Sequence, residues 1–213
     1  MKFCVIGVGR FGYHVATILA KNDVDVLVVD SNEAIIASIR DKVTHAICMR
    51  ISDEEGLRAI GVDEIDTVVI AMGENFAQSI LVTALLKQRL KVPRVIARSI
   101  SQIHKEILEL VGADEVILPE RDAGIILADR LSLPFKTLFR LAENFSISEI
   151  VAPAFFIGST VDEIDFHDTY EVTLLGKKVN KKIIPLKGTM QIEEGDLLIV
   201  SGSNENLLYL KNL

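Results

Sequence analysis

The sequence opens with Val5-Ile6-Gly7-Val8-Gly9-Arg10-Phe11-Gly12, a G-x-G-x-x-G turn that directly follows an apolar run. The first glycine permits a tight turn, the second lets backbone N–H groups approach a phosphate, and the third lets a helix pack closely on its strand. A helix that begins near Phe11 directs its positive end and unpaired N–H groups at that phosphate. The stretch therefore predicts a nucleotide-binding strand, turn and helix.

An acidic residue stands at the distance that such a site requires. A second apolar run, residues 24–29, ends on Asp30. At the carboxyl end of a strand, this carboxylate is placed to accept hydrogen bonds from ribose hydroxyls. Two other interpretations remain open: the acid serves as a helix N-cap or turn residue, and the glycines serve only strand-to-helix packing.

Composition restricts the class of protein. The 213 residues, of which 49% are apolar, suit one large domain or a medium and a small one. No signal peptide pattern is present, and no apolar stretch approaches the roughly 20 residues of a bilayer span, so a cytoplasmic protein is expected. The net charge of -7 argues against an extended nucleic-acid-binding surface, although it permits a local phosphate site.

The cysteines and histidines show no metal-ligand spacing. Cys4 and Cys48 lie inside apolar strand-like runs, so we expect them to pack in the core. The four histidines are scattered, and a structural zinc site is not expected.

One sequence pattern repeats through the first 120 or so residues: a short run of β-branched residues is followed by an amphipathic helical stretch. Such alternation indicates βαβ units and a parallel sheet covered on both faces, a Rossmann-like doubly wound α/β fold with its ligand crevice at the strands' carboxyl ends. Strands are predicted at 3–6, 24–29, 46–49, 67–71, 94–97 and 115–118, and helices at 13–20, 34–40, 54–60, 76–87 and 102–110.

The alternating pattern defines a first domain at 1–120, and it changes after residue 120. A long helical stretch is predicted from 121 to about 142, with Pro134 in Leu133-Pro134-Phe135 as its end or kink. The second piece is too apolar for a solvated linker, having Phe135, Leu138, Phe139 and Leu141. We interpret 121–143 as a helical crossover and dimerisation linker, with packing on the parent sheet as the alternative.

A smaller unit, a C-terminal α+β domain at 144–213, is predicted after Asn144. Strands are expected at 147–151, 171–175, 183–186 and 197–200, the last after the turn Glu193-Glu194-Gly195-Asp196. About 70 residues with several short strands form a marginal domain alone, so dimerisation through this unit is also expected.

The sequence predicts a nucleotide-binding domain like that of an oxidoreductase, but no recognisable catalytic domain beside it. Its C-terminal part has one histidine, His167, in the polar stretch Asp165-Phe166-His167-Asp168, where a solvated loop side chain is expected. No Ser/His/Asp or Cys/His set and no Tyr-x-x-x-Lys pairing stands out, so we predict no catalytic residue and favour a nucleotide sensor. A small NAD-dependent oxidoreductase and a free-standing NADH-responsive redox sensor with a non-membrane partner remain alternatives.

Further motifs extend over nearly the whole chain. They are the glycine turn, Val29-Asp30-Ser31-Asn32-Glu33, Ala71-Met72-Gly73-Glu74-Asn75, Ala97-Arg98, Gly112-Ala113-Asp114, Pro119-Glu120-Arg121-Asp122 and Gly195-Asp196-Leu197-Leu198-Ile199-Val200. In this order and spacing, the chain resembles the cytoplasmic regulators of potassium uptake and conductance, the RCK or KtrA/TrkA type. The resemblance implies an N-terminal RCK (TrkA-N) and a C-terminal RCK (TrkA-C) domain.

What the resemblance implies is a gating ring without catalytic turnover. Dimers form an octameric ring beneath a membrane-embedded potassium-translocating subunit of the KtrB/TrkH type, so the protein lies at the inner face of the membrane. ATP and ADP, or NAD and NADH in some members, bind at the glycine turns and change the ring's shape. In the KtrA type, ATP favours the conducting state. In some relatives the small domain binds cyclic di-AMP, here over residues 160–185 with His167 as the nearest contact.

The resemblance also assigns roles to single residues. Arg10 corresponds to an arginine that reaches a terminal phosphate across the dimer interface, which would distinguish ATP from ADP; a solvated helix-start residue is the alternative. Asp30 and Asn32 match a ribose-contacting pair, and Asn32 also suits a helix cap. Arg98 stands where relatives place a basic group near phosphate, or is a surface residue. Glu120 matches a glutamate that helps hold a divalent cation or sodium beside the phosphates, or is an acid favoured at a helix N-terminus.

One departure from the family pattern leaves the nucleotide open. Many relatives have Gly-Asp-Ala-Thr after the third strand, whereas this chain has Met49-Arg50-Ile51-Ser52. Arg50 either alters base or ribose contacts or adds a positive group toward the phosphates, so the choice between ATP/ADP and NAD(H) stays open. The predicted nucleotide site comprises Gly7, Gly9, Arg10, Phe11, Gly12, Asp30, Ser31, Asn32, Arg50, Ala71, Gly73, Asn75, Arg98 and Glu120, the last also as the metal ligand.

Overall fold

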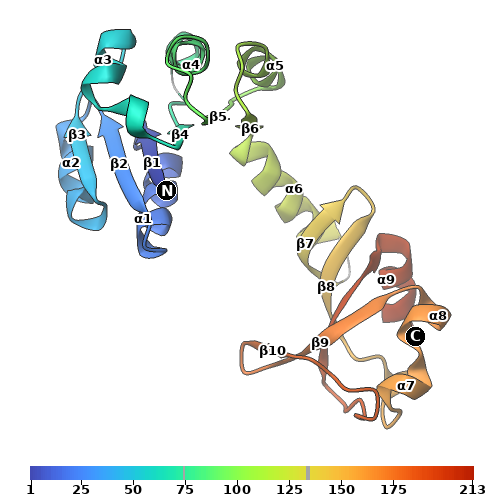
Figure 1. Cartoon of the computed structure of the whole chain (residues 1–213). Helices are drawn as coiled ribbons and strands as arrows, with labels where there is room; N and C mark the ends of the chain where they lie inside the picture. The colour runs from blue at the N-terminus through green and yellow to red at the C-terminus, as the bar shows by residue number, and fades with distance from the viewer. Residues whose placement is uncertain (74, 133–134) are drawn as a thin grey trace. The chain divides into compact units, whose positions relative to one another are not determined.

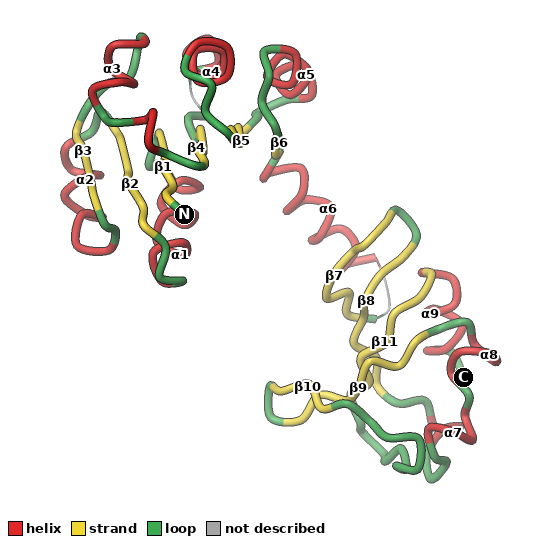
Figure 2. The backbone as a smooth tube through the Cα atoms, viewed as in Figure 1, coloured by secondary structure: helices red, strands yellow, loops and turns green. Residues whose placement is uncertain are grey.

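The computed structural model describes residues 1–73, 75–132 and 135–213 and divides into two compact units, Met1–Arg121 and Asp122–Leu213 (Figure 1). Glu74 of the quoted Ala71–Asn75 motif and the predicted kink at Leu133-Pro134 lie outside the described residues. Each unit has its own sheet, drawn in yellow in Figure 2.

The first unit is the predicted Rossmann-like fold. Its six strands are parallel and lie in the order β3-β2-β1-β4-β5-β6. Because the order reverses between β1 and β4, the ligand crevice of such a sheet lies at the carboxyl ends of these strands. The strands are β1 Lys2–Ile6, β2 Asp25–Asp30, β3 His45–Cys48, β4 Thr67–Ile70, β5 Arg94–Arg98 and β6 Glu115–Ile117.

Helices and helical turns separate these strands as predicted. They are α1 Arg10–Lys21, α2 Glu33–Ile39, η1 Arg40–Lys42, α3 Glu54–Ala59, η2 Val62–Glu64, α4 Phe76–Ala84, η3 Leu85–Arg89 and α5 Gln102–Leu110. The predicted helix at 76–87 differs in one respect: α4 ends at Ala84 and continues as the π-helical turn η3, where Leu90 N–H donates to Leu85 O at 2.9 Å.

The central strands are apolar on both faces because helices cover the sheet on both sides. Successive residues of β1 and β4 pack alternately into two clusters: Cys4 and Val68 into one, Val5 and Val69 into the other. This two-sided burial explains why the central strands read as continuous apolar runs in the sequence.

The cysteine prediction is correct for Cys4 and wrong for Cys48. Cys4 is fully buried in the central strand β1, and burial raises the pKa of its thiol to about 12. Cys48 is exposed because β3 is the edge strand of the sheet, so one side of its residues lacks a neighbouring strand. Its Sγ lies 3.7 Å from Ser31 O.

The second unit has the α+β fold predicted for 144–213, but it begins at Asp122 and its sheet includes β7, which lies before residue 144. Its five strands are antiparallel in the order β10-β9-β11-β8-β7. They are β7 Lys136–Ala142, β8 Phe145–Val151, β9 Thr173–Val179, β10 Lys182–Ile184 and β11 Leu197–Ser203, and the helical segments are η4 Ala154–Phe156, α7 Val161–Ile164, α8 Phe166–Tyr170 and α9 Asn204–Lys211. His167 is exposed as expected, but it lies in the short helix α8 rather than in a loop.

The helical stretch predicted for 121–142 is half correct. Its first piece is α6 Pro119–Ser132, but the second is the strand β7, paired antiparallel with β8 through Ala142 and Phe145. The helical prediction there is wrong because the apolar residues of 135–141 fit both the helical period of about 3.6 residues and the strand period of 2. Pairing with β8 decides for the strand. A two-residue connection, Glu143-Asn144, closes this hairpin.

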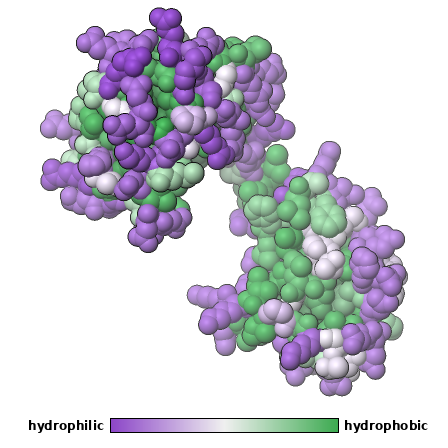
Figure 3. Space-filling model, in the orientation of Figure 1, coloured by the Kyte–Doolittle hydropathy of each residue, from purple (hydrophilic) through white to green (hydrophobic). Residues whose placement is uncertain are grey.

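Apolar side chains remain uncovered on α6 and β7, which we call the α6/β7 surface. No residue of α6 is buried, and Ile126, Leu127, Leu131, Phe139 and Leu141 are all exposed. Figure 3 shows hydrophobic residues gathered on this part of the second unit. Exposed apolar patches of this kind mark interaction sites in soluble proteins.

Phe156 anchors the core of the second unit, and its substitution tests that role. Its ring is 1% exposed and lies 5.3 Å from the rings of Phe166 and Tyr170. We expect Phe156→Ala to lower the free energy of unfolding by about 3–5 kcal/mol because it leaves a cavity. Phe155→Ala is the matched control: its side chain is 72% exposed. Urea denaturation followed by circular dichroism measures both, and equal losses would contradict this assignment.

Candidate functional site

The turn between β1 and α1 requires glycine at two positions. Gly7 has a φ of +88°, and a Cβ there would lie 2.7 Å from Met72 Cγ. A Cβ on Gly12 would lie 2.1 Å from Gly7 O, so the first turn of α1 can pack on the turn only when this residue lacks a side chain. Both glycines are therefore required by the packing of the turn itself.

Gly9 has a different role. A Cβ at Gly9 would meet no atom within 4 Å, so packing within the protein does not require glycine there. Gly9 precedes α1, where no side chain caps the helix and no acidic residue lies in the first turn. The first N–H groups and the positive end of α1 are thus available to an anion at Gly9.

Asp30 joins the glycine turn to the end of β2. Its Oδ2 accepts a hydrogen bond from Val8 N–H at 2.6 Å, and its Oδ1 accepts one from Asn32 N–H at 2.8 Å. A carboxylate has roughly four lone-pair sites, so each oxygen retains capacity for a ribose hydroxyl. Asp30 thus serves as a turn residue, as one of the alternative interpretations held. This role is compatible with a ligand contact.

Asn32 caps α2. Its Oδ1 accepts hydrogen bonds from Ala34 N–H at 2.9 Å and Ile35 N–H at 3.2 Å. The capping role expected for this residue is therefore confirmed. Its side-chain NH2 group is the part left to contact a ligand.

Arg98 and Glu120 form an ion pair at the carboxyl end of β5. The Arg98 side chain is 20% exposed and Glu120 is 69% exposed. Arg98 Nη2 donates to Glu120 Oε1, and Arg98 Nε is buried without a hydrogen-bond partner among the described residues. A Cβ on Gly73 would lie 2.4 Å from Arg98 Nη1, so glycine at this position makes room for the guanidinium. The positively charged guanidinium of Arg98 is thus held in place at the carboxyl end of β5.

These groups border one cavity of about 1070 Å³ in the first unit, large enough for a nucleotide. It is lined by Gly7, Gly9, Arg10, Phe11, His14, Asp30, Ser31, Asn32, Ile35, Ala71, Met72, Gly73, Asn75, Arg98, Ile100 and Glu120. Positive charge from Arg10, Arg98 and the α1 terminus gathers on it, while Phe11, Ile35 and Met72 supply apolar contact area.

Most residues of the predicted site line this cavity, and two do not. Gly12 is buried under the turn. Arg50 is exposed and lines a smaller neighbouring cavity of about 350 Å³, which shares Gly7, Asp30 and Asn75 with the large one. Arg50 therefore lies near the predicted site and on its β3 side.

Four lining residues were missed in the sequence. His14 follows Arg10 by four residues, and Ile35 follows Asn32 by three, which places each on the same helix face as its neighbour. Ile100 follows Arg98 by two residues in the loop after β5, and Met72 lies inside a motif already quoted. Helical spacing is the signal that would have found the first two.

The described parts of the chain (1–73, 75–132 and 135–213) contain no group of three His, Cys, Asp or Glu side chains that could hold a metal ion. Glu120 is one carboxylate and is already paired with Arg98. A cation at Glu120 would therefore need further oxygen ligands from outside this chain, such as nucleotide phosphates.

Comparisons with known proteins agree with this architecture. The TrkA-N domain model matches residues 3–119, and the TrkA-C domain model matches residues 146–213. The chain is 33% identical over 205 residues to the Ktr system potassium uptake protein C of Bacillus subtilis, covering 95% of this chain and 92% of that protein. It is 30% identical over 213 residues to the Ktr system potassium uptake protein A of the same organism, covering 99% and 96%.

A solved structure shows the same fold in a longer protein. The GsuK channel bound to NAD matches 98% of this chain with a TM-score of 0.68 and 18% identity. This chain spans 39% of that one. At this identity the likeness concerns the fold alone.

The close contact at Gly12 is open to a direct test. We expect Gly12→Ala to destabilise the protein by about 1–3 kcal/mol because its Cβ overlaps Gly7 O. Gly124→Ala is the matched control, since Gly124 lies inside α6 and a Cβ there meets nothing within 4 Å. Chemical denaturation of both variants measures the difference. A Gly12→Ala variant as stable as the control would show that the turn can relax at little cost.

Proposed function

The chain belongs to the TrkA-N/TrkA-C family of RCK-type potassium-uptake regulators, and from that premise we propose that it is a nucleotide-sensing regulatory subunit of a potassium uptake system. The proposed ligand is ATP or ADP, with NAD or NADH as the second candidate. Binding would change the shape of a ring of these subunits and so control potassium flux through a membrane partner. No catalytic turnover is part of this function.

One observation carries the proposal: the uncapped positive end of α1 borders a nucleotide-sized cavity together with Asp30. A helix N-terminus behind a glycine turn binds phosphate through its N–H groups. Asp30 Oδ2 lies 2.6 Å from Val8 N, so the ribose-binding carboxylate and the phosphate-binding turn are held at a constant separation. The two ends of a nucleoside phosphate match this pair of groups.

Arg10 supplies a basis for distinguishing ATP from ADP. It is the first residue of α1, exposed, and part of the cavity lining. ATP has one more phosphate and more negative charge than ADP, so a guanidinium that contacts the terminal phosphate binds ATP more tightly. Such a difference shifts a ring between two shapes only to the extent that each shape binds the nucleotide differently.

A cation is a secondary part of the proposal. Arg98 already neutralises Glu120, and within the described residues of this chain one carboxylate does not build a metal site. A divalent cation or sodium would bind where Glu120 meets the phosphates of a nucleotide, which carry the remaining oxygen ligands. When bound, that cation would neutralise phosphate charge.

The identity of the nucleotide depends on Arg50. Its position on the smaller cavity, beside Met49 and Asp30, suits a contact with the base or ribose rather than with a terminal phosphate. The solved GsuK channel is bound to NAD, which keeps the dinucleotide a candidate here.

The α6/β7 surface supports the proposed assembly into dimers and an octameric ring. Phe139 is 64% exposed and Leu131 is 77% exposed, and a second copy would remove both from water. Residues 121–143 would then serve as the crossover and dimerisation linker, between a nucleotide domain at 1–120 and a small domain at 144–213.

The proposed location is the inner face of the cell membrane, through a potassium-translocating partner of the KtrB/TrkH type. The likeness to the two Ktr potassium uptake proteins of Bacillus subtilis supports such a partner. No helix of the described chain is long and apolar enough to cross a bilayer.

The small domain has a second proposed ligand, cyclic di-AMP, over residues 160–185. His167 is exposed on α8 and available for such a contact. This ligand is proposed only for the assembled dimer, where two copies of the segment would meet.

Calorimetric binding of ATP, ADP, NAD and NADH tests the proposed function, using the wild type, Arg10→Ala and the control Arg40→Ala. Arg40 is exposed, with 69% of its side chain accessible, and does not line the cavity. We expect adenine nucleotides to bind the wild type, with ATP losing roughly tenfold in Arg10→Ala, about one charged hydrogen bond, and ADP losing less. The Arg40→Ala variant should bind like the wild type.

Two results would redirect the interpretation. Tight NADH binding that is indifferent to Arg10 would contradict the phosphate-count mechanism and favour a redox sensor. Substrate-dependent turnover of the nicotinamide would favour the oxidoreductase alternative. Binding of the purified protein to vesicles with and without a potassium translocator separates the membrane-partner proposal from a free-standing sensor.

The assembly proposal has its own test at the α6/β7 surface. We expect Phe139→Asp to shift the protein toward monomer because a carboxylate cannot be buried unpaired against a second copy. Ile18→Asp, at a 53% exposed position of α1, is the control. Sedimentation velocity at several concentrations measures both, and an unchanged oligomer in Phe139→Asp would show that this surface is not the contact.

A further inference from the structure

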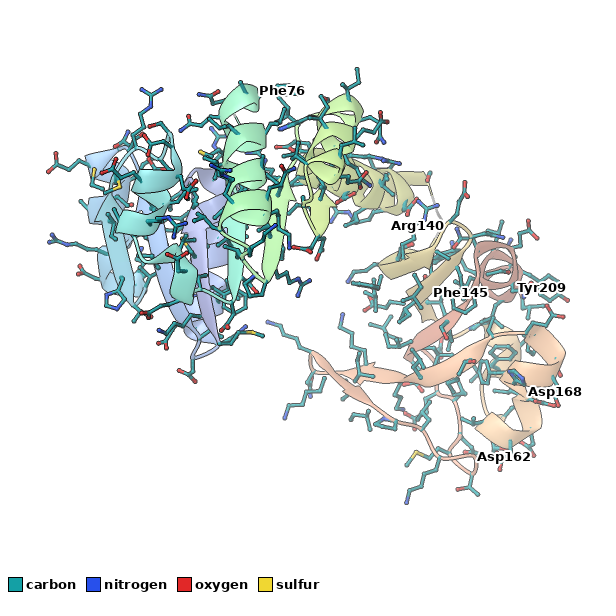
Figure 4. All side chains as sticks on the ribbon, turned by 45° about the horizontal axis from the view of Figure 1, so that its top comes forward. Phe76, Arg140, Phe145, Asp162, Asp168 and Tyr209 are labelled. Atoms are coloured by element: carbon teal, nitrogen blue, oxygen red, sulfur yellow. The ribbon has the colours of Figure 1, made fainter. Side chains whose placement is uncertain are left out.

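His104 is a fully buried histidine in the first turn of α5, and the described binding groups do not include it. Its ring lies between α4 and the loop that joins β5 to α5. The centroid of the Phe76 ring is 4.4 Å from that of His104, and Phe76 is labelled on α4 in Figure 4. Buried histidines without a partner are costly, so the contacts of both ring nitrogens define its role.

The hydrogen bonds fix its protonation state. Ile100 N–H faces His104 Nδ1 at 3.4 Å, a long hydrogen bond in which Nδ1 accepts, so the hydrogen of a neutral ring is on Nε2. Nε2 lies 2.9 Å from Ser79 Oγ, which accepts that hydrogen when its own hydroxyl donates to Phe76 O at 2.9 Å. The ring is therefore neutral, with its hydrogen on Nε2.

The two partners belong to two different walls of the nucleotide cavity. Ile100 lines that cavity two residues beyond Arg98. Ser79 and Phe76 belong to the first turn of α4, directly after the lining residue Asn75. One imidazole thus connects the wall that follows β5 to the wall that follows β4.

We propose that His104 is a positioning residue for the nucleotide site, holding the Arg98–Ile100 wall and the start of α4 at the separation that the ligand needs. The inference rests on the proposed nucleotide binding and adds a residue that does not touch the ligand. Loss of either hydrogen bond frees one wall to move and lowers affinity without removing a ligand contact.

The same geometry makes the position sensitive to protonation. Addition of a second proton would place an N–H on Nδ1 against the Ile100 N–H, two donors face to face. Burial also lowers the pKa of His104 below its ordinary 6.5, in agreement with a neutral ring. Because the folded protein favours the neutral form, stability should fall as pH drops below 6.5 toward that lowered pKa, and affinity should fall only where the folded protein itself takes up the second proton, at and below that pKa.

Few charges face this ring. No titratable side chain occurs in α4, Phe76–Ala84, or in the Ser99-Ile100-Ser101 loop. On α5 itself, Lys105 pairs with Glu109 at 3.6 Å and Glu106 is exposed. On β6, which also packs against α5, Glu115 pairs with Arg94 at 2.7 Å. Protonation of His104 is therefore not coupled to a charged side chain of α4 or of the Ser99-Ile100-Ser101 loop.

Two substitutions separate the two bonds. His104→Gln places an amide donor near Nε2 but provides no acceptor for Ile100 N–H, and His104→Asn places an acceptor near Nδ1 but does not reach Ser79. We expect each to weaken ATP and ADP binding by about tenfold at pH 8, because each leaves one buried group unpaired. Ser79→Ala, which retains His104, carries the test if these variants do not fold. His45→Gln, exposed at the edge strand, is the control.

The pH profile distinguishes positioning from general stability. As pH falls from 8 to the lowered pKa of His104, the wild type should lose more affinity than the His104 variants, and comparison of the proteins at each pH removes the effect of proton binding by the nucleotide. Variants that melt at a lower temperature but match the wild type in affinity and pH profile would overturn the positioning role of His104 and leave the proposed function intact. Absence of any nucleotide binding in the wild type would overturn the proposed function and, with it, this inference.

Discussion

The closure of the turn between β1 and α1 is the constraint on which the rest of the site depends. Gly12 packs directly on the Gly7 carbonyl, and the Asp30 carboxylate accepts from Val8 N–H at 2.6 Å and from Asn32 N–H at 2.8 Å. These contacts hold the glycine turn against the connection between the end of β2 and the start of α2, about 20 residues later in the chain. The helix end and the carboxylate then face one cavity because the parallel sheet brings the strand ends together.

Charge on the opposite side of the cavity is arranged by a second set of contacts. Glu120 pairs with Arg98, and the absence of a side chain at Gly73 leaves room for the guanidinium. His104 extends this wall to α4, so the basic side of the site and the helix after β4 form one connected element.

The second unit combines a closed core with an uncovered apolar surface. Its core is closed by Phe156, Leu198 and Leu207, whereas the α6/β7 surface exposes apolar side chains that nothing in the described chain covers. Under the proposed function, a regulatory subunit transmits a change of shape to other subunits, and an exposed apolar surface would suit such a contact.

Local patterns were sufficient to predict the first sheet and the glycine turn between β1 and α1, because G-x-G-x-x-G, continuous apolar strands and Asp30 occur together in one fold. The sequence also predicted most of the cavity lining, although His14, Ile35, Met72 and Ile100 were missed. Only the tertiary structure decided that Lys136–Ala142 is a strand, since pairing with β8 outweighs an ambiguous apolar period. It alone showed that Cys48 lies on an edge strand, that Arg50 lies on the smaller cavity, and that His104 joins two walls. Each of these depends on contacts between residues far apart in the chain, which a local pattern does not encode.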